Sequence, residues 1–166
     1  WAQNQLKVLK SSTSQLIAND ALELSLKIGN NTDKDSLNEG LKMFAKAELL
    51  GFQQKYQQAI DSLSYVLKQF KGQQIEDDAL YTQALYYQEL TGYAEAESNL
   101  LSILDFHPES LLYDDSIYML GILYRDHLAD PDKAKAMFER IIFEYPSSIY
   151  LVDARVAFRA LRGDDI

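Results

Sequence analysis

The sequence predicts an all-α fold, a solenoid of stacked antiparallel helix pairs. The first reason is an internal repeat, because one apolar pattern recurs every 37 to 38 residues and is marked by Ala59, Ala96 and Ala134. Apolar residues follow each alanine at the fourth, seventh and eighth positions, which lie on one face of an amphipathic helix. The second reason is that three prolines and seven glycines in 166 residues are few for a β-sandwich, which needs frequent turns. Repeated helices of this kind stack into an elongated array.

Each repeat is predicted to contain two helices. The second helix of each pair holds the alanine, and these helices are expected at about 55–70, 92–106 and 131–145. The first helix of each pair carries a small residue in a matching register, at Ala47, Ala84 and Gly121. A small side chain at that position lets two helices approach closely. The earliest of these first helices is expected to run from about 35 to 51.

Turn and cap residues mark the ends of these helices. Gly51 and Gly92 are expected to stop the first helices of two repeats, and Asp130 should cap the helix that begins at Pro131. Acidic pairs open two first helices, Asp77-Asp78 and Asp114-Asp115. We expect these carboxylates to act as helix caps rather than as a cation site.

We expect one continuous domain with repeats of unequal regularity. The segment 1–36 is predicted to be an irregular helical segment with a partial repeat. Three repeats follow it, at 37–74, 75–111 and 112–148. The segment 149–166 is predicted to be a capping helix and tail, because the last repeat of a solenoid needs its apolar edge covered.

Composition narrows the class of partner. The net charge of −9 repels a phosphate backbone, so nucleic acid is not an expected partner. No apolar run is long enough to cross a bilayer, so no transmembrane segment is expected in this chain. The absence of cysteine removes disulfides, thiol catalysis and thiolate metal sites. We expect no metal and no cofactor.

No residue is predicted to be catalytic. The sequence contains no glycine-rich phosphate loop, no H-E-x-x-H and no G-x-S-x-G motif. His107 shares a repeat position with Phe70 and Tyr145, which favours an aromatic packing role. His127 has acidic neighbours but no accompanying nucleophile or oxyanion site. The chain is therefore not expected to be an enzyme.

The best copy of the repeat has a known skeleton, formed by Leu120-Gly121, Tyr124, Ala134, Phe138 and Pro146. With these residues the chain resembles the tetratricopeptide-repeat superfamily over about 37–162. The segments "DFHPES", "FEYPSS" and "DPDKAKAMFERII" resemble bacterial exported members of the outer-membrane-assembly lipoprotein and Tol-associated periplasmic type. This likeness favours a periplasmic or outer-membrane-associated location and leaves a cytoplasmic one open.

The resemblance implies a superhelix whose concave wall is made by the first helices. The partner-binding residues that it implies are Phe44, Glu48, Asp78, Tyr81, Leu85, Gln88, Asp115, Tyr118, Ile122 and Arg125. Phe44, Tyr81 and Tyr118 occupy positions where chaperone-binding members clamp a carboxylate with basic side chains, so no such clamp is expected here. The acidic flanks favour a basic or neutral ligand. In the alternative interpretation, the three aromatic rings pack between helices and meet no ligand.

Two functional hypotheses follow. The first is a non-enzymatic scaffold that binds a partner protein or peptide on its concave face, as a segment of a larger exported bacterial protein. The second is a structural module that forms a homodimer through an exposed repeat edge, without a peptide ligand. That edge is expected around Leu6, Leu9, Leu22 and Leu26.

Overall fold

The computed structural model describes Leu24 and residues 39–164. All regular elements in this part of the chain are helices. They are α3 (Glu39–Phe52), α4 (Tyr56–Gln69), α5 (Ile75–Glu89), α6 (Tyr93–Phe106), α7 (Tyr113–Asp126), α8 (Pro131–Glu144) and α9 (Leu151–Arg162). The predicted irregular segment at 1–36 lies outside the described residues, except for Leu24.

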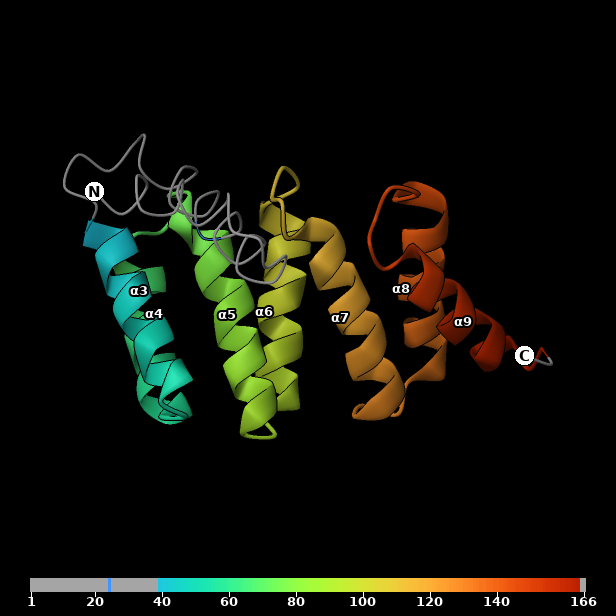
Figure 1. Cartoon of the computed structure of the whole chain (residues 1–166), viewed down its shortest axis with the longest axis horizontal. Coiled ribbons are helices and arrows are strands. Elements are labelled where there is room, and N and C mark those ends of the chain that lie inside the picture. The colour runs from blue at the N-terminus through green and yellow to red at the C-terminus, as the bar shows by residue number, and fades with distance from the viewer. Residues whose placement is uncertain (1–23, 25–38, 165–166) are drawn as a thin grey trace, which may run out of the picture.

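The helices stand side by side as antiparallel pairs (Figure 1). Helix α3 packs on α4, α5 on α6 and α7 on α8, and the pairs are joined where α4 meets α5 and α6 meets α7. Helix α9 packs on α8 and completes the row. This is the predicted all-α solenoid. The second helices α4, α6 and α8 begin and end within a residue of the predicted bounds.

The acidic pairs do not occupy the positions predicted for them. They lie in the first turns of α5 and α7, whose N-cap residues are Gln74 and Leu112 and have no side-chain cap hydrogen bond. The carboxylates still add favourable charge beside the positive end of each helix dipole. The predicted cap at Asp130 is confirmed, because its carboxylate accepts a hydrogen bond from the backbone N–H of Lys133 at 3.0 Å.

The predicted glycine stops are wrong. Gly51 lies inside α3, and Gly92 is the N-cap of α6 with a φ of −80°. The left-handed residues that follow the first helices are Gln54, Thr91 and Ala129. Gly51 is needed for a different reason, since a Cβ there would overlap the ring of Tyr86 on the next pair.

Small residues bring the two helices of a pair together, as predicted. Ala47 and Ala84 are fully buried. A Cβ on Gly121 would lie 2.7 Å from Cε1 of Phe138, which is closer than packed atoms tolerate. The glycine therefore makes room for the Phe138 ring between α7 and α8.

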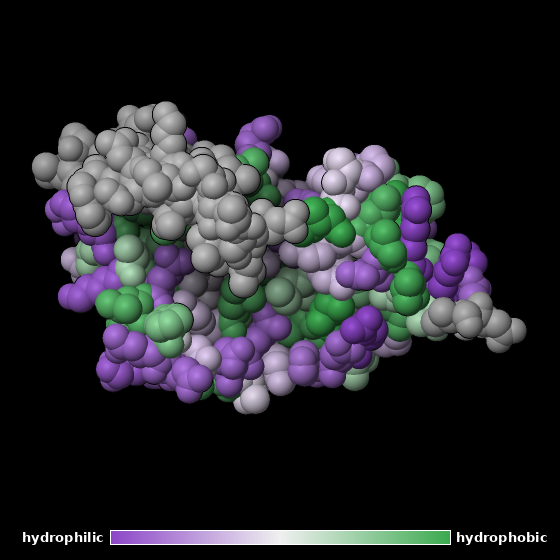
Figure 2. All heavy atoms as spheres, in the orientation of Figure 1, coloured by the Kyte–Doolittle hydropathy of each residue, from purple (hydrophilic) through white to green (hydrophobic). Residues whose placement is uncertain are grey.

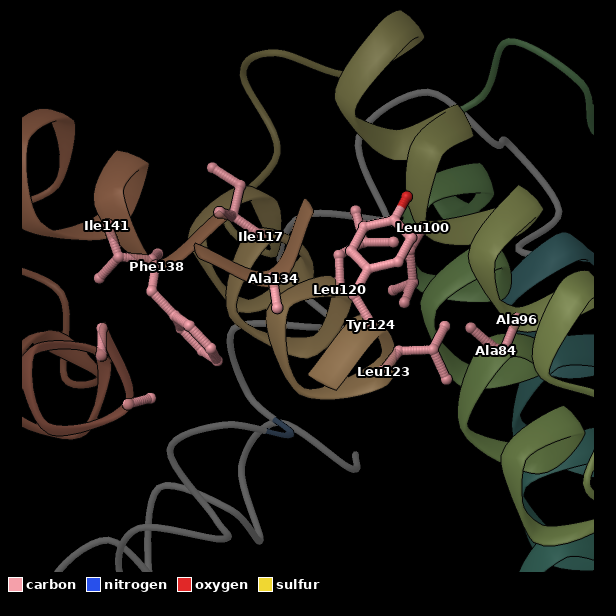
Figure 3. Packing of buried hydrophobic residues seen from close by; sticks show 12 residues of the cluster. Ala84, Ala96, Leu100, Ile117, Leu120, Leu123, Tyr124, Ala134, Phe138 and Ile141 are labelled. Atoms are coloured by element: carbon pink, nitrogen blue, oxygen red, sulfur yellow. The ribbon is translucent and has the colours of Figure 1, made fainter. Parts of the chain in front are cut away.

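The buried apolar side chains form two clusters. The larger cluster spans α5 to α9 and includes Leu100, Leu120 and Phe138 (Figure 3). The smaller cluster joins α3, α4 and the start of α5 around Phe44 and Leu63. The boundary between the two clusters falls within α5, since Ile75 and Ala79 belong to the smaller cluster and Ala84 belongs to the larger one.

A buried amide, Gln83, sits at that boundary. Its Nε2 donates to the carbonyl oxygen of Ile60 at 2.9 Å and to Oγ of Ser64 at 2.8 Å. Its Oε1 accepts from Nδ2 of Asn99 at 2.9 Å. One side chain of α5 thus bonds to α4 and α6 together, which satisfies the polar atoms that its burial removes from water.

Helix α9 covers the last pair on one side only. Ala154 and Ala157 are buried against the larger cluster, whereas Arg155 and Arg159 are exposed. A helix with an apolar inner face and a charged outer face suits the end of a solenoid. This arrangement agrees with the predicted capping helix.

Candidate protein-binding groove

The described surface contains an open groove between α5 and the connection that joins α6 to α7. Its volume is about 840 Å³. All residues of that connection, 106–112, line one wall. The opposite wall is α5, through Asp77, Asp78, Tyr81, Thr82, Leu85 and Tyr86. Gln74 and Glu48 complete the lining. We call this feature the α5 groove.

Large apolar side chains stand exposed on the connection side of the groove. Phe106 is 75% exposed and Leu111 is 67% exposed. Figure 2 shows apolar surface near the start of α7 and again near the start of α9, where Val152 and Val156 are exposed. Aromatic and aliphatic side chains held in water beside a concave surface are typical of binding sites.

Hydrogen bonds fix the connection against α5. Oγ of Ser110 donates to the Asp77 carboxylate at 2.6 Å. Nε2 of His107 lies 3.8 Å from the Glu76 carboxylate, which itself accepts from the backbone N–H of Gly72 at 2.6 Å. His107 is thus half-buried against α5, in agreement with its predicted packing role. The hydrogen bond from Ser110 to Asp77 thus ties this wall of the groove to α5, which reduces the freedom that the wall would lose on binding a ligand.

The structure brings four of the predicted binding residues together. Glu48, Asp78, Tyr81 and Leu85 all line the α5 groove. The other six do not line it. Phe44 is fully buried in the smaller cluster, and Ile122 packs against the larger one.

Two polar residues among the six have distinct surroundings. Arg125 makes two hydrogen bonds to the Asp126 carboxylate, at 2.7 and 2.8 Å. This bonding raises the pKa of Arg125 and lowers that of Asp126. Nε2 of Gln88 is buried and makes no hydrogen bond within the described part of the chain.

Tyr118 and Asp115 are covered by Tyr150. The rings of Tyr118 and Tyr150 stack with centroids 4.3 Å apart and planes 9° apart. The Tyr150 hydroxyl donates to Oδ1 of Asp115 at 2.8 Å. The Tyr118 ring also meets Phe138 edge-on, with centroids 5.9 Å apart. Burial, and then the nearby charge of Asp153, raises the pKa of Tyr118. The aromatic column is therefore divided, because Tyr81 lines a groove while Tyr118 lies under another ring.

The turns before α7 and α9 have the same backbone geometry. The N–H of Leu112 donates to Oγ of Ser110 at 3.0 Å, and the N–H of Tyr150 donates to Oγ of Ser148 at 3.2 Å. Leu112 has φ −93° and ψ 11°, and Tyr150 has φ −85° and ψ 0°. Leu112 and Tyr150 are thus equivalent positions. Tyr150 covers Tyr118, whereas Leu112 is a shorter side chain in the wall of the groove beside Tyr81.

Sequence reasoning missed the residues of the connection. Phe106, Glu109, Leu111 and Leu112 were not among the predicted site residues, although they form a wall of the groove. The prediction followed helix positions only, and these residues lie at or beyond the end of α6. The pair Leu111-Leu112 in a short turn was the signal that could have indicated them, because turn residues are usually polar.

The side chain of His127 packs against an aromatic ring. Its ring stacks on Tyr93, with centroids 4.1 Å apart and planes 13° apart.

Within residues 39–164 no group of three or more His, Asp or Glu side chains is arranged to hold a metal ion. None of the helices in that part combines the length and the apolar character needed to cross a membrane.

The fold and the groove together define an α-solenoid with an open groove on its described surface. In the comparison with known proteins, residues 115–148 match the tetratricopeptide repeat model. A solved tetratricopeptide repeat protein from Parabacteroides merdae ATCC 43184 has a similar fold, with a TM-score of 0.63 and 20% sequence identity. The match covers 98% of this chain and 60% of that protein, so the chain spans less than two thirds of its length. No curated protein matches the chain.

Proposed function

We propose that the chain is a non-enzymatic scaffold that binds a partner protein or peptide in the α5 groove. Tetratricopeptide solenoids generally use their concave surfaces for protein recognition. The observation that carries the proposal is the exposure of Phe106 and Leu111 beside a groove of about 840 Å³. Aromatic side chains are enriched in the buried centres of protein interfaces, and large apolar side chains exposed beside a concave surface often mark such sites.

The hydrogen bonds of the connection support the same proposal. Ser110 ties this wall to Asp77, so Phe106 and Leu111 stand on a fixed support. A fixed wall loses little conformational freedom on binding, which favours affinity. Tyr81 adds a rigid ring and a hydroxyl to the opposite wall.

The proposed binding site is tested by comparing substitutions of two exposed phenylalanines, one beside the groove and one away from it. A displayed random-peptide library is panned on the protein, and the affinity of the selected peptides is measured for Phe106→Ser and for Phe143→Ser. Phe143 lies on α8, outside the groove lining, and is 72% exposed, so the two changes should cost similarly little stability. We expect Phe106→Ser to weaken binding at least tenfold and Phe143→Ser to leave it unchanged. Equal affinities in the two variants would contradict the proposal.

The exported, larger protein suggested by the sequence stays part of this proposal. Its support is the likeness of "DFHPES" and "FEYPSS" to exported bacterial repeat proteins, together with a match that covers 60% of a longer tetratricopeptide protein. Cell fractionation of the encoding organism tests it. Recovery with the periplasm or the outer membrane is expected, and recovery with the cytosol would contradict it.

The structural, self-associating alternative has less support. The leucines predicted to form its edge, Leu6, Leu9, Leu22 and Leu26, lie outside the described residues. Light scattering on this chain and on a longer form distinguishes the two functions. A dimer in both forms that forms equally well with Phe106→Ser would favour the alternative.

A further inference from the structure

We propose that the α5 groove selects a cationic, amphipathic segment of its partner, one that places Lys or Arg beside large apolar side chains. This inference rests on the proposed function and names the chemistry of the partner. It begins from the charges that surround the groove. Among the described residues that line it, Glu48, Asp77, Asp78 and Glu109 are acidic and none is Lys or Arg.

The carboxylates come from different elements and face one space. Asp77 belongs to the first turn of α5, and Glu109 belongs to the opposite wall. The carboxylate of Asp77 accepts a hydrogen bond from the Ser110 hydroxyl, a neutral group that fixes the position of the carboxylate and brings no positive charge to it. A hydrogen-bonded, ionised carboxylate still has room for further donors. Two walls of one sign give a negative potential that low-dielectric sides concentrate.

The apolar lining decides what else the ligand must carry. Tyr81, Leu85 and Tyr86 line one wall, and Phe106 and Leu111 lie on the other. A bare cation or a polar polycation would leave these side chains in contact with water. A segment with both charged and apolar residues matches both kinds of lining.

The net charge of the whole chain also favours a cationic partner. The net charge of −9 draws a cationic partner from a distance and repels an acidic one. This steering weakens as salt is added, because the Debye length falls to about 10 Å at 0.1 M ionic strength. Binding should therefore depend on salt.

The experiment compares three synthetic peptides on the full chain. Each is a capped peptide of about a dozen residues. Every second residue is Leu, and the positions between hold Ser or a variable residue, which is Lys in one peptide, Gln in the second and Glu in the third. Affinities are measured by fluorescence anisotropy at low and at high salt. We expect the Lys peptide to bind at least tenfold tighter than the Gln peptide, and the Glu peptide to bind weakest. The advantage of the Lys peptide should shrink at high salt.

Two charge-reversal variants test whether the preference for the Lys peptide arises in the groove. Glu109→Lys changes the groove, and Glu139→Lys makes the same change of net charge at an exposed position on α8, outside the groove lining. Glu109→Lys should remove most of the preference for Lys over Gln, and Glu139→Lys should keep it. Equal losses in both variants would overturn the inference, because the preference would then follow net charge alone.

The outcomes separate this inference from the proposed function. If the Lys and Gln peptides bind equally and Phe106→Ser weakens both, the groove binds peptides and the cationic preference is overturned. If no binding responds to Phe106→Ser, the proposed function fails and the inference fails with it. If the chain self-associates, Phe106→Ser abolishes this association and the Lys peptide does not bind, the groove is occupied by a second copy and the inference is overturned.

Discussion

The turns that follow the α5–α6 and α7–α8 helix pairs have similar backbone geometry, but they carry different side chains. The turn after each pair is closed by the same serine bond, to the N–H of Leu112 in one and of Tyr150 in the other. Tyr150 stacks on Tyr118 and bonds to Asp115, which closes the concave surface. Leu112 lies in the wall of an open groove beside Tyr81. The two pairs thus differ in the side chain that stands at one turn position, Leu112 beside the groove and Tyr150 over Tyr118.

The junctions between neighbouring pairs, α4 with α5 and α6 with α7, also differ. Leu120 of α7 is fully buried in the larger apolar cluster. The equivalent position in α5 is Gln83, which bonds to Ser64 and Asn99. The position equivalent to Ser64 in α6 is Leu101, which packs against the larger cluster. Two apolar residues, Leu101 and Leu120, thus stand at α6 and α7 where α4 and α5 have two polar residues, Ser64 and Gln83. The following predictions replace residues of one kind by residues of the other.

The largest effect is expected from Leu120→Gln. This change removes a fully buried leucine and places an amide where its neighbours Ile117 and Leu123 are apolar. The free energy of unfolding should fall by about 3 kcal/mol or more. Urea denaturation followed by circular dichroism measures it, with Leu120→Met as the control, which should cost less than about 1.5 kcal/mol. A similar loss in both variants would show that polarity is not the cause.

A smaller effect is expected from Tyr150→Leu. The change removes the stacked ring and the bond to Asp115, and we expect a loss of about 2 kcal/mol in the free energy of unfolding. Tyr150→Phe keeps the ring and should lose only about 1 kcal/mol. Denaturation curves of the two variants separate the contributions. If Tyr150→Phe costs as much as Tyr150→Leu, the stack on Tyr118 adds no stability.

The same variants have a predictable response to pH. Burial, and then the hydrogen bond to Asp115, raises the pKa of Tyr150 above that of an unfolded tyrosine. Its stabilising contribution is therefore complete below a pH of about 10 and declines as the pH rises further. Tyr150→Phe should show a weaker loss of stability above that pH. An unchanged alkaline response would contradict this assignment.

The smallest effect is expected from Gln83→Leu. The change leaves Asn99 and Ser64 without their bonds to the amide, and it should cost about 1–2 kcal/mol. Adding Ser64→Leu rebuilds the apolar pair found at Leu101 and Leu120, so the double variant should recover part of the loss. The two single variants and the double variant are compared in a double-mutant cycle. Strictly additive losses would mean that the polar pair is not a unit.

The fold was predictable because the repeat constrains helix faces. Ala59, Ala96 and Ala134 fix the register of the second helices, and burial of these alanines follows from it. Helix stops were less predictable, since Gln54 and Thr91 adopt the left-handed conformation that glycine was expected to supply, and Ala129 adopts it in the third turn. The surrounding packing imposes that conformation, and a sequence pattern does not record it.

The candidate site was predictable only in part. Tyr81 and Asp78 were placed by their helix positions, and they line the groove. Tyr118 holds the same helix position, but its exposure depends on Tyr150, which lies 32 residues further along the chain. Phe106 and Leu111 escaped prediction because a connection has no period from which its direction could be inferred. Contacts between distant segments thus decide which residues of a repeated face stay accessible.

The most direct test of the account is Leu112→Tyr. The backbone of Leu112 matches that of Tyr150, so a tyrosine at 112 should extend over Tyr81 and fill the α5 groove. Binding of the Lys peptide is measured together with the melting temperature, with Leu112→Met as the control that keeps the groove open. The account predicts that Leu112→Tyr weakens binding at least tenfold without lowering the melting temperature, while Leu112→Met binds as before. Unchanged affinity in a folded Leu112→Tyr protein would contradict the claim that this groove is the binding site.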